Sequence, residues 1–284
     1  MNKVFSDNQT LLLGIEKFEN NSFLNRSEQF SVYTVLLISK GEGIYNADFA
    51  SFSFKAPVIL FSTPQQSISI KEISPLTYTT LQFHGDFYCI EYHRKEVACN
   101  GLLFNNIYIE PSIRLTFEQH QLYNQLVDHI IDEMKQQTPS EIVLRSFLQL
   151  ILAKSSSLKI NSEKQNFQKD EKMDQFKKLL EENFLSLHKA SDYAILLSMT
   201  SNNFTKQCGK RFNKTPTQMI QERLILEAKK QLHLTKLSIK EIAYNLKFQD
   251  EYYFSRVFKK MTKVSPQTFR KTTGISIVAD LSIE

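Results

Sequence analysis

Two groups of polar side chains, fifty residues apart, have the composition of surfaces that recognise nucleic-acid bases. The first is Asn202, Asn203, Thr205, Lys206 and Lys210, and the second is Glu251, Tyr252, Ser255, Arg256 and Lys259. Arginine reads guanine with two hydrogen bonds, asparagine reads adenine, and serine or threonine suits a base or a phosphate. Lys210 and Lys259 are better suited to phosphates, which set register without reading sequence. For one isolated helix, a solvated polar face is the ordinary alternative.

Both groups belong to an internal repeat. Phe204–Pro216 aligns without a gap with Phe254–Pro266, and each copy follows a short predicted helix that contains a small residue, Ala194 or Ala243. Two short helices joined by a tight turn form a helix-turn-helix unit, whose first helix braces a second that enters the major groove. The repetition favours a pair of DNA-binding units over two solvated faces.

The inner faces of the two units differ in composition. The second unit has the fuller apolar set: Ile239, Ile242, Ala243, Leu246, Phe248, Phe254, Val257 and Phe258. The first has Ala194, Leu197, Met199, Phe204 and Cys208. We therefore expect the second unit to be the more rigid and the first the more adaptable.

The elements that position these residues are helices. We predict helices at 170–184, 190–197, 201–212, 217–234, 239–246, 251–261 and 266–272, with capping signals at Thr215-Pro216, Ser238 and Ser265-Pro266. The helix 217–234 joins the two units and spans roughly 27 Å. That length is close to the roughly 34 Å repeat of B-DNA, so one domain could reach two consecutive major grooves.

Charge is unevenly distributed along the 284 residues. Residues 170–284 hold 20 Lys/Arg against 13 Asp/Glu, whereas residues 1–169 hold 15 against 17. A basic C-terminal third is expected of a nucleic-acid-binding module. No apolar run approaches the roughly 18 residues of a membrane span, the N-terminus lacks a signal-peptide core, and three cysteines fit a reducing cytoplasm.

The first half of the chain has a different character. Short apolar runs at 32–38, 49–54, 57–61 and 77–83, separated by turn residues, predict a small β sandwich or barrel. A capping box at Thr116 and an almost wholly apolar stretch after Pro139 then predict two helices. These could be core helices, or one face could pair with a second subunit. Residues 154–169 are polar and read as a linker.

The C-terminal part resembles the AraC/XylS family of bacterial transcription regulators. The similarity covers about residues 170–275 and is strongest over Ser238–Arg270, which follows the family's second-unit signature. The resemblance implies that bases are read at Asn202, Thr205 and Lys206, and at Tyr252, Ser255 and Arg256. Three turn positions that are glycine in the family are Asn213, Lys247 and Lys263 here, which puts the fine geometry of the second unit in question.

The N-terminal part is more loosely similar to the cupin-like sensor domain of such regulators, over Leu81–Asn106. Gly41–Phe54 lacks the paired histidines of metal-using cupins, so we expect no metal, cofactor or catalytic residue. A Cys89, Glu91, His93 and Cys99 cluster matches no zinc spacing. A ligand could lie among the domain's aromatic residues, which are more often core: Tyr33, Tyr45, Phe52, Phe54, Tyr78, Phe83 and Tyr88.

The expected chain is multidomain: an all-β cupin-like barrel (1–115), a helical dimerisation segment (116–153), a linker (154–169) and an all-α domain with two helix-turn-helix units (170–275). The expected function is a cytoplasmic, non-enzymatic transcription regulator. Its expected partners are double-stranded promoter DNA, a second copy of the chain, an unidentified small-molecule effector and, for an activator, RNA polymerase. A cupin-type metal enzyme with a DNA-binding tail and a non-specific architectural DNA binder are the alternatives.

Overall fold

A computed structural model describes residues 2–5, 10–19, 23–48, 50–89, 102–104, 106–165 and 170–273. The chain forms two compact units. Unit 1 comprises Met1–Asn106 and Glu110–Asn166, and unit 2 comprises Ile107–Ile109 and Phe167–Glu284. The Glu91, His93 and Cys99 side chains of the cysteine–histidine cluster considered above lie outside the described residues.

Unit 1 contains a six-stranded antiparallel sheet in the order β1-β2-β9-β4-β7-β10. Its strands are β1 (Asn2–Phe5), β2 (Leu11–Glu19), β4 (Tyr33–Lys40), β7 (Val58–Ser62), β9 (Thr77–Phe83) and β10 (Ser112–Arg114). The central strands β4, β7 and β9 are buried along almost their whole length, because both faces of this sheet are covered. This explains why these strands read as continuous apolar runs in the sequence.

A four-stranded antiparallel sheet in the order β3-β8-β5-β6 covers one of those faces. Its strands are β3 (Glu28–Gln29), β5 (Glu42–Ala47), β6 (Ala50–Lys55) and β8 (Ser67–Glu72), and a short 3-10 helix, η1 (Phe23–Asn25), precedes β3. Burial alternates along β5 and β8, so one face points into the core between the sheets. The expected all-β architecture is therefore confirmed as two packed antiparallel sheets.

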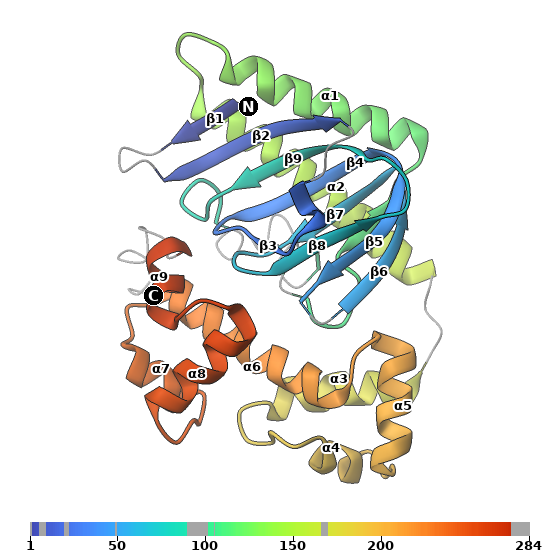
Figure 1. Cartoon of the computed structure of the whole chain (residues 1–284), viewed down its shortest axis with the longest axis vertical. Helices are drawn as coiled ribbons and strands as arrows, with labels where there is room; N and C mark the ends of the chain where they lie inside the picture. The colour runs from blue at the N-terminus through green and yellow to red at the C-terminus, as the bar shows by residue number, and fades with distance from the viewer. Residues whose placement is uncertain are drawn as a thin grey trace. The chain divides into compact units, whose positions relative to one another are not determined.

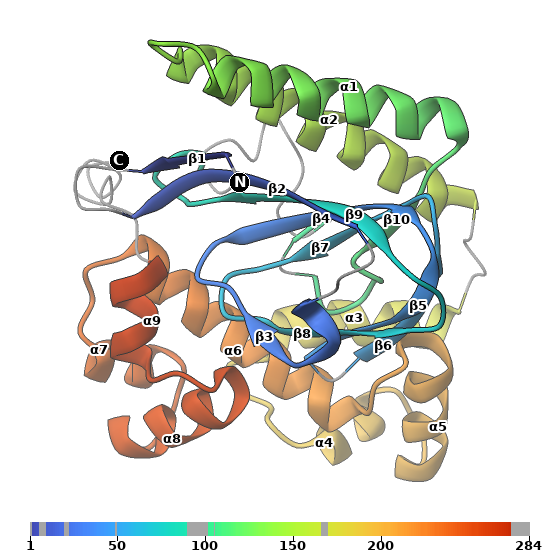
Figure 2. The same cartoon turned by 45° about the horizontal axis from the view of Figure 1, so that its top comes forward.

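Two helices cover the other face of the six-stranded sheet (Figure 2). α1 (Phe117–Met134) begins at the predicted capping box, in which Thr116 accepts from the Gln119 N–H and the Gln119 side chain accepts from the Thr116 N–H. Its buried side chains, Tyr123, Leu126, Val127, Ile130 and Ile131, join one core with α2 (Glu141–Gln165) and the sheet. Unit 1 is thus a three-layer structure of helices, sheet and sheet.

The α2 helix corrects the prediction of a linker from residue 154. It continues to Gln165 because the polar side chains in this stretch are used internally. Ser155 is buried and pairs with the Tyr123 hydroxyl, and the buried Lys159 donates to the carbonyls of Glu110 and Ser112. Sequence hydropathy counts such residues as solvent-exposed, which is why the helix end was missed.

The aromatic residues considered as a ligand site are largely core residues. Tyr33, Tyr45, Phe54, Tyr78, Phe83 and Tyr88 are all buried, and Phe52 is half-buried against the core between the sheets. Tyr33 stacks on Phe83 at 5.2 Å between ring centroids, and the Tyr45 hydroxyl donates to the Phe61 carbonyl at 3.0 Å. Among the described residues, these aromatic side chains thus take part in core packing.

Unit 2 is helical from Asp170 onward, within the described residues. Its helices are α3 (Glu171–Asn183), α4 (Ala190–Leu196), α5 (Ser201–Phe212), α6 (Pro216–Leu234), α7 (Ile239–Asn245), α8 (Glu251–Thr262) and α9 (Pro266–Thr273). The predicted N-terminal caps are present: Thr215 with Gln218 and Ser238 with Glu241 both form complete capping boxes. The predicted helical order is therefore confirmed.

Candidate DNA-binding surface

The first helix-turn-helix unit consists of α4, α5 and a turn that contains one residue with left-handed backbone conformation. Ser198 has φ 53°, its N–H donates to the Ile195 carbonyl, and the Met199 N–H donates to the Ala194 carbonyl. This paired arrangement is the Schellman motif that closes a helix C-terminus. It sends the chain out of α4 in a defined direction, into α5.

The second unit repeats this turn at the corresponding residues. Lys247 has φ 60°, its N–H donates to the Tyr244 carbonyl, and the Phe248 N–H donates to the Ala243 carbonyl. The repeat seen in the sequence therefore extends to individual backbone hydrogen bonds. The turn into α8 is one residue longer than the turn into α5: one residue lies between Ser198 and the N-cap Thr200, whereas two lie between Lys247 and the N-cap Asp250.

Both recognition helices end in the same way. Asn213 after α5 has φ 55° and Lys263 after α8 has φ 64°, and their N–H groups donate to the Gly209 and Lys259 carbonyls. The three non-glycine turn positions noted in the sequence thus keep the left-handed backbone that glycine would adopt. For the two lysines this costs roughly 1 kcal/mol each, because Cβ approaches the following carbonyl.

The core of the first unit is built around Phe204 and Cys208 on α5. Phe176 of α3 packs edge-on against Phe204 at 4.8 Å, and Ala194 of α4 supplies the small residue at the helix crossing. Cys208 is fully buried, and this burial, with a smaller contribution from Asp170, raises the pKa of its thiol to about 12. The thiol is therefore a neutral packing group and not a reactive one.

The core of the second unit is built around Phe254 and Phe258 on α8. Phe248 from the turn packs edge-on against Phe254 at 5.2 Å, and Phe269 of α9 packs against Phe258 at 5.6 Å. Ala243 lies at the helix crossing, as Ala194 does in the first unit. Ala243, Phe254 and Phe258 are predicted core positions and are buried, whereas the predicted Phe248 is half-buried. Phe269 is buried as well, although it was not among the predicted core positions.

The α6 helix connects the two helix-turn-helix units (Figure 1). Its side chains contribute to the cores of both. Ile220 and Leu224 pack with α3, α4 and α5, whereas Ala228 and Leu232 pack with α7 and α8. The apolar residues of α6 are thus divided between the two cores. Because α6 is one continuous helix that packs against both helix-turn-helix units, it fixes the distance between these two repeats.

All the side chains predicted to contact DNA from α5 are exposed: Asn202, Asn203, Thr205, Lys206 and Lys210. They lie opposite Phe204, Cys208 and Phe212, the buried face of the same helix. Two of them have local bonds, since Thr205 donates to the Ser201 carbonyl and Asn203 accepts from Gln207. These bonds are weak enough in solvent to be exchanged for bonds to a ligand.

On α8 the predicted set is less uniform. Tyr252, Arg256 and Lys259 are exposed, with Tyr252 at 74%, whereas Glu251 and Ser255 are only partly accessible. Tyr253, which the sequence reasoning left out, is 49% exposed, and its ring lies 5.9 Å from the Arg256 guanidinium carbon. Tyr253 lies three residues before Arg256, which puts both side chains on the same side of the helix. This spacing is the sequence signal that could have identified Tyr253 as a surface residue.

The predicted DNA-contacting cations lie on the outward sides of both recognition helices. Within the described residues, none of Lys206, Lys210, Arg256 and Lys259 forms an ion pair. Elsewhere in unit 2, Lys177, Lys214 and Arg223 are paired with carboxylates. Unneutralised cations on both recognition helices are what phosphate binding requires.

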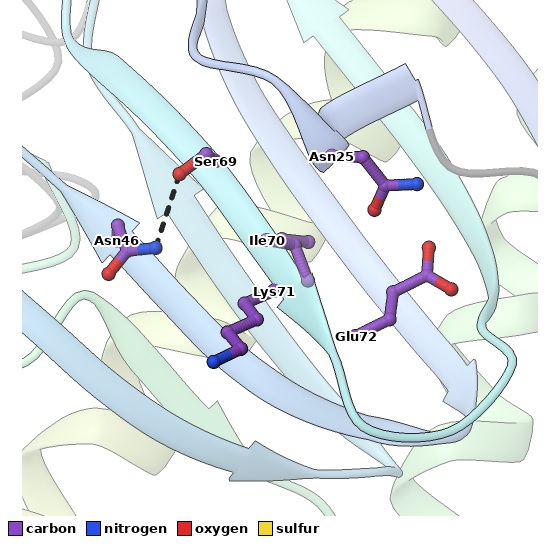
Figure 3. Close-up of a pocket in the computed structure, with 6 residues that line it drawn as sticks. All are labelled: Asn25, Asn46, Ser69, Ile70, Lys71 and Glu72. Atoms are coloured by element: carbon purple, nitrogen blue, oxygen red, sulfur yellow. Dashed lines mark hydrogen bonds between the residues drawn. The ribbon is translucent and has the colours of Figure 1, made fainter.

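Unit 1 has a surface depression of about 390 Å³ beside β8 (Figure 3). Its lining is polar, from Asn25, Asn46, Ser69, Ile70, Lys71 and Glu72. The two charged side chains follow one another on a strand and point to opposite sides, so they do not converge on one ligand. The depression therefore offers no defined effector site.

The described residues contain no group of three or more His, Cys, Asp or Glu side chains placed to hold a metal ion. They also contain no helix with the length and apolar character of a membrane span.

Residues 193–272, from α4 to α9, match a protein family described as "Helix-turn-helix domain". Residues 193–272 form a helix-turn-helix domain of the AraC type. A curated relative from Pseudoalteromonas carrageenovora, an "Uncharacterized HTH-type transcriptional regulator in cgkA 5'region", is 33% identical over 93 residues. That match covers 33% of this chain and 55% of the relative, so the chain spans about half the length of the protein it matches.

Solved structures similar to this chain include ToxT from Vibrio cholerae O395, at 15% identity and a TM-score of 0.42 over 92% of this chain and 98% of that one. The C-terminal domain of the response regulator yesN from Fusobacterium nucleatum is 25% identical over 34% of this chain and 96% of that one, with a TM-score of 0.33. Both TM-scores lie below 0.5, so neither structure bears on the function of this chain.

Proposed function

We propose that this protein is a sequence-specific transcription regulator that places α5 and α8 in successive major grooves of promoter DNA. The observation that supports this most is the duplicated unit: the same backbone hydrogen bonds in the turn, the same helix end and outward cations with no ion pair among the described residues occur twice. α6, with 19 residues, is about 28 Å long, close to one turn of B-DNA.

The base-reading residues in this proposal are Asn202, Asn203, Thr205 and Lys206 on α5, and Glu251, Tyr252, Ser255 and Arg256 on α8. Lys210 and Lys259 lie in the last turn of each helix and contact phosphates. Arg256 is the strongest candidate for recognising a single base, because a guanidinium can donate hydrogen bonds to O6 and N7 of one guanine at the same time.

Unit 1 supplies dimerisation in this proposal, and control by a small molecule acts through it. The α2 helix has an exposed apolar side that the rest of unit 1 does not cover, with Ile142 at 78% and Leu150 at 41% exposure. These two residues are eight apart and share one face of the helix. A matching helix from a second copy would bury them. In this proposal the regulator works in the cytoplasm and catalyses no reaction. If it activates transcription, it contacts RNA polymerase.

The test is a fluorescence titration of the purified full chain against promoter fragments and against scrambled DNA, at two salt concentrations. We expect specific fragments to bind at least about 10³-fold more tightly than scrambled DNA, with affinity falling steeply as salt rises. Uniformly weak binding to every sequence would remove the claim of specificity and favour an architectural role. Size-exclusion chromatography with Ile142→Asp tests the dimer.

A further inference from the structure

Unit 2 includes three residues that come from much earlier in the sequence. Ile107–Ile109 belongs to unit 2, although the chain up to Asn106 and from Glu110 belongs to unit 1. The predicted N-terminal domain, residues 1–115, included these residues, so their place is not visible from sequence order. The three residues are called the inserted segment below.

The side chain of Ile107 completes the core of the first helix-turn-helix unit. It is buried and packs in the cluster that contains Phe176, Phe204 and Phe212. Its carbonyl accepts a hydrogen bond from the Lys214 ammonium at 3.2 Å, and the same ammonium pairs with Glu222 at 2.7 Å. Lys214 lies in the turn between α5 and α6, so the inserted segment holds that turn.

Tyr108 contacts the end of α5 and an ion-pair network. Its ring packs edge-on against Phe212, the last residue of α5, at 6.2 Å. Its hydroxyl donates to the Glu181 carboxylate at 2.5 Å, and the other oxygen of that carboxylate accepts from Arg223 of α6 at 2.8 Å. Burial, then Glu181, raises the pKa of Tyr108 well above its usual range, so the hydroxyl remains a donor.

We propose that the inserted segment is a positioning element for DNA recognition: it fixes the C-terminal end of α5 and the α5–α6 turn, and so the orientation in which α5 reads bases. This rests on the proposed function. Ile107 and Tyr108 contact α3, α5 and α6, and their contacts converge on the end of α5, not on its exposed face. No corresponding segment packs in the core of the second unit among the described residues.

The segment is also anchored on both sides in unit 1. Phe104 packs in the unit 1 core, 5.1 Å from Tyr33 and 5.4 Å from Phe61, and β10 pairs with β7 from Ser112 onward. A change in the unit 1 core around Phe104 therefore has a short covalent path to the end of α5.

The test uses the full chain and a DNA site selected by the wild-type protein. The bases under α5 are those whose discrimination is lost in Thr205→Ala, and the bases under α8 are those lost in Arg256→Ala. We expect Tyr108→Phe and Ile107→Ala to bind the intact site about tenfold more weakly, a change of about 1.4 kcal/mol. The loss of discrimination should be confined to the α5 bases.

The matched control is Tyr123→Phe, which removes a buried tyrosine hydroxyl from its bond to Ser155 in unit 1. It should change neither affinity nor discrimination. Unchanged or tighter binding by Tyr108→Phe, or equal losses at the α5 and α8 bases, would overturn the proposal. Tyr108→Phe keeps the test decisive if Ile107→Ala fails to fold.

If the wild-type chain selects no DNA sequence, the proposed function fails separately. The inserted segment is then tested by amide hydrogen exchange. Tyr108→Phe should speed exchange over residues 209–219, at the end of α5 and the start of α6, and leave residues 254–262 of α8 unchanged. Equal exchange in both proteins would contradict the proposal.

Discussion

The outward-facing residues of the two recognition helices are of two chemical kinds: some suit recognition of a base, and others suit binding of a phosphate. Arg256 has a planar donor pair that suits guanine, whereas Lys259 carries a point charge that suits a phosphate. Both side chains are exposed and neither has an acidic partner in the described part of the chain. The two substitutions should therefore have different signatures.

Arg256→Ala should cost about 1–3 kcal/mol of discrimination at one base pair and little on scrambled DNA, because a bidentate contact is lost. Lys259→Ala should weaken binding to all sequences alike and lower the slope of log affinity against log salt by about 1. Competition titrations with single-base variants of the site, at two or more salt concentrations, measure both. Equal losses on every DNA for Arg256→Ala would identify a non-specific binder.

The buried residues of the recognition helices differ in size more than in exposure. Phe258 and Cys208 hold matching places in the two units and are both fully buried. Phe258→Ala should destabilise the C-terminal unit by about 3–5 kcal/mol, because it leaves a large cavity. Cys208→Ala should cost about 1 kcal/mol, since roughly one heavy atom is lost. Urea unfolding of both variants measures the difference, and equal losses would contradict the proposed asymmetry of the two cores.

At the scale of the element, the turns of the helix-turn-helix units contain a correctable strain. Lys247 and Lys263 adopt left-handed backbone that lysine disfavours. Lys247→Gly and Lys263→Gly should each raise the free energy of unfolding by about 1 kcal/mol. The control is Lys206→Gly, the same change within α5, which should lower stability by about 1 kcal/mol. Thermal unfolding would contradict this account if the turn variants were no more stable than wild type.

Element positions could be predicted from the sequence wherever local signals agree. The capping boxes at Thr116, Thr215 and Ser238 were legible because the capping side chain and its partner are three residues apart. The bounds of α5 were found because Phe204, Cys208 and Phe212 recur at helical spacing. The outward set on α5 followed from that same spacing, whereas Tyr253 on α8 was missed although it lies beside Arg256.

Structural features that depend on contacts between residues far apart in the sequence could not be predicted. The last part of α2 reads as a linker, and it is ordered by Lys159, which bonds carbonyls of Glu110 and Ser112 nearly fifty residues away. The place of Ile107 in the core of the first unit depends in the same way on Lys214, 107 residues later. Local sequence propensity carries no signal for a hydrogen bond between residues so far apart in the chain.

For the whole molecule, two units share one chain, and the proposed function assigns DNA recognition to one and assembly and control to the other. The basic C-terminal third, the duplicated turn and the outward cations all belong to unit 2. The exposed apolar face of α2 belongs to unit 1. In this proposal, unit 2 reads DNA sequence through two helices at once.

Selection of binding sites from a random double-stranded DNA library by the purified full chain tests this claim most directly. The account predicts an enriched motif with two blocks of specified bases, about 10–10.5 base pairs apart, one helical turn. Thr205→Ala should relax one block and Arg256→Ala the other. A library that remains random after selection, or a motif with a single block that both substitutions relax, would contradict it.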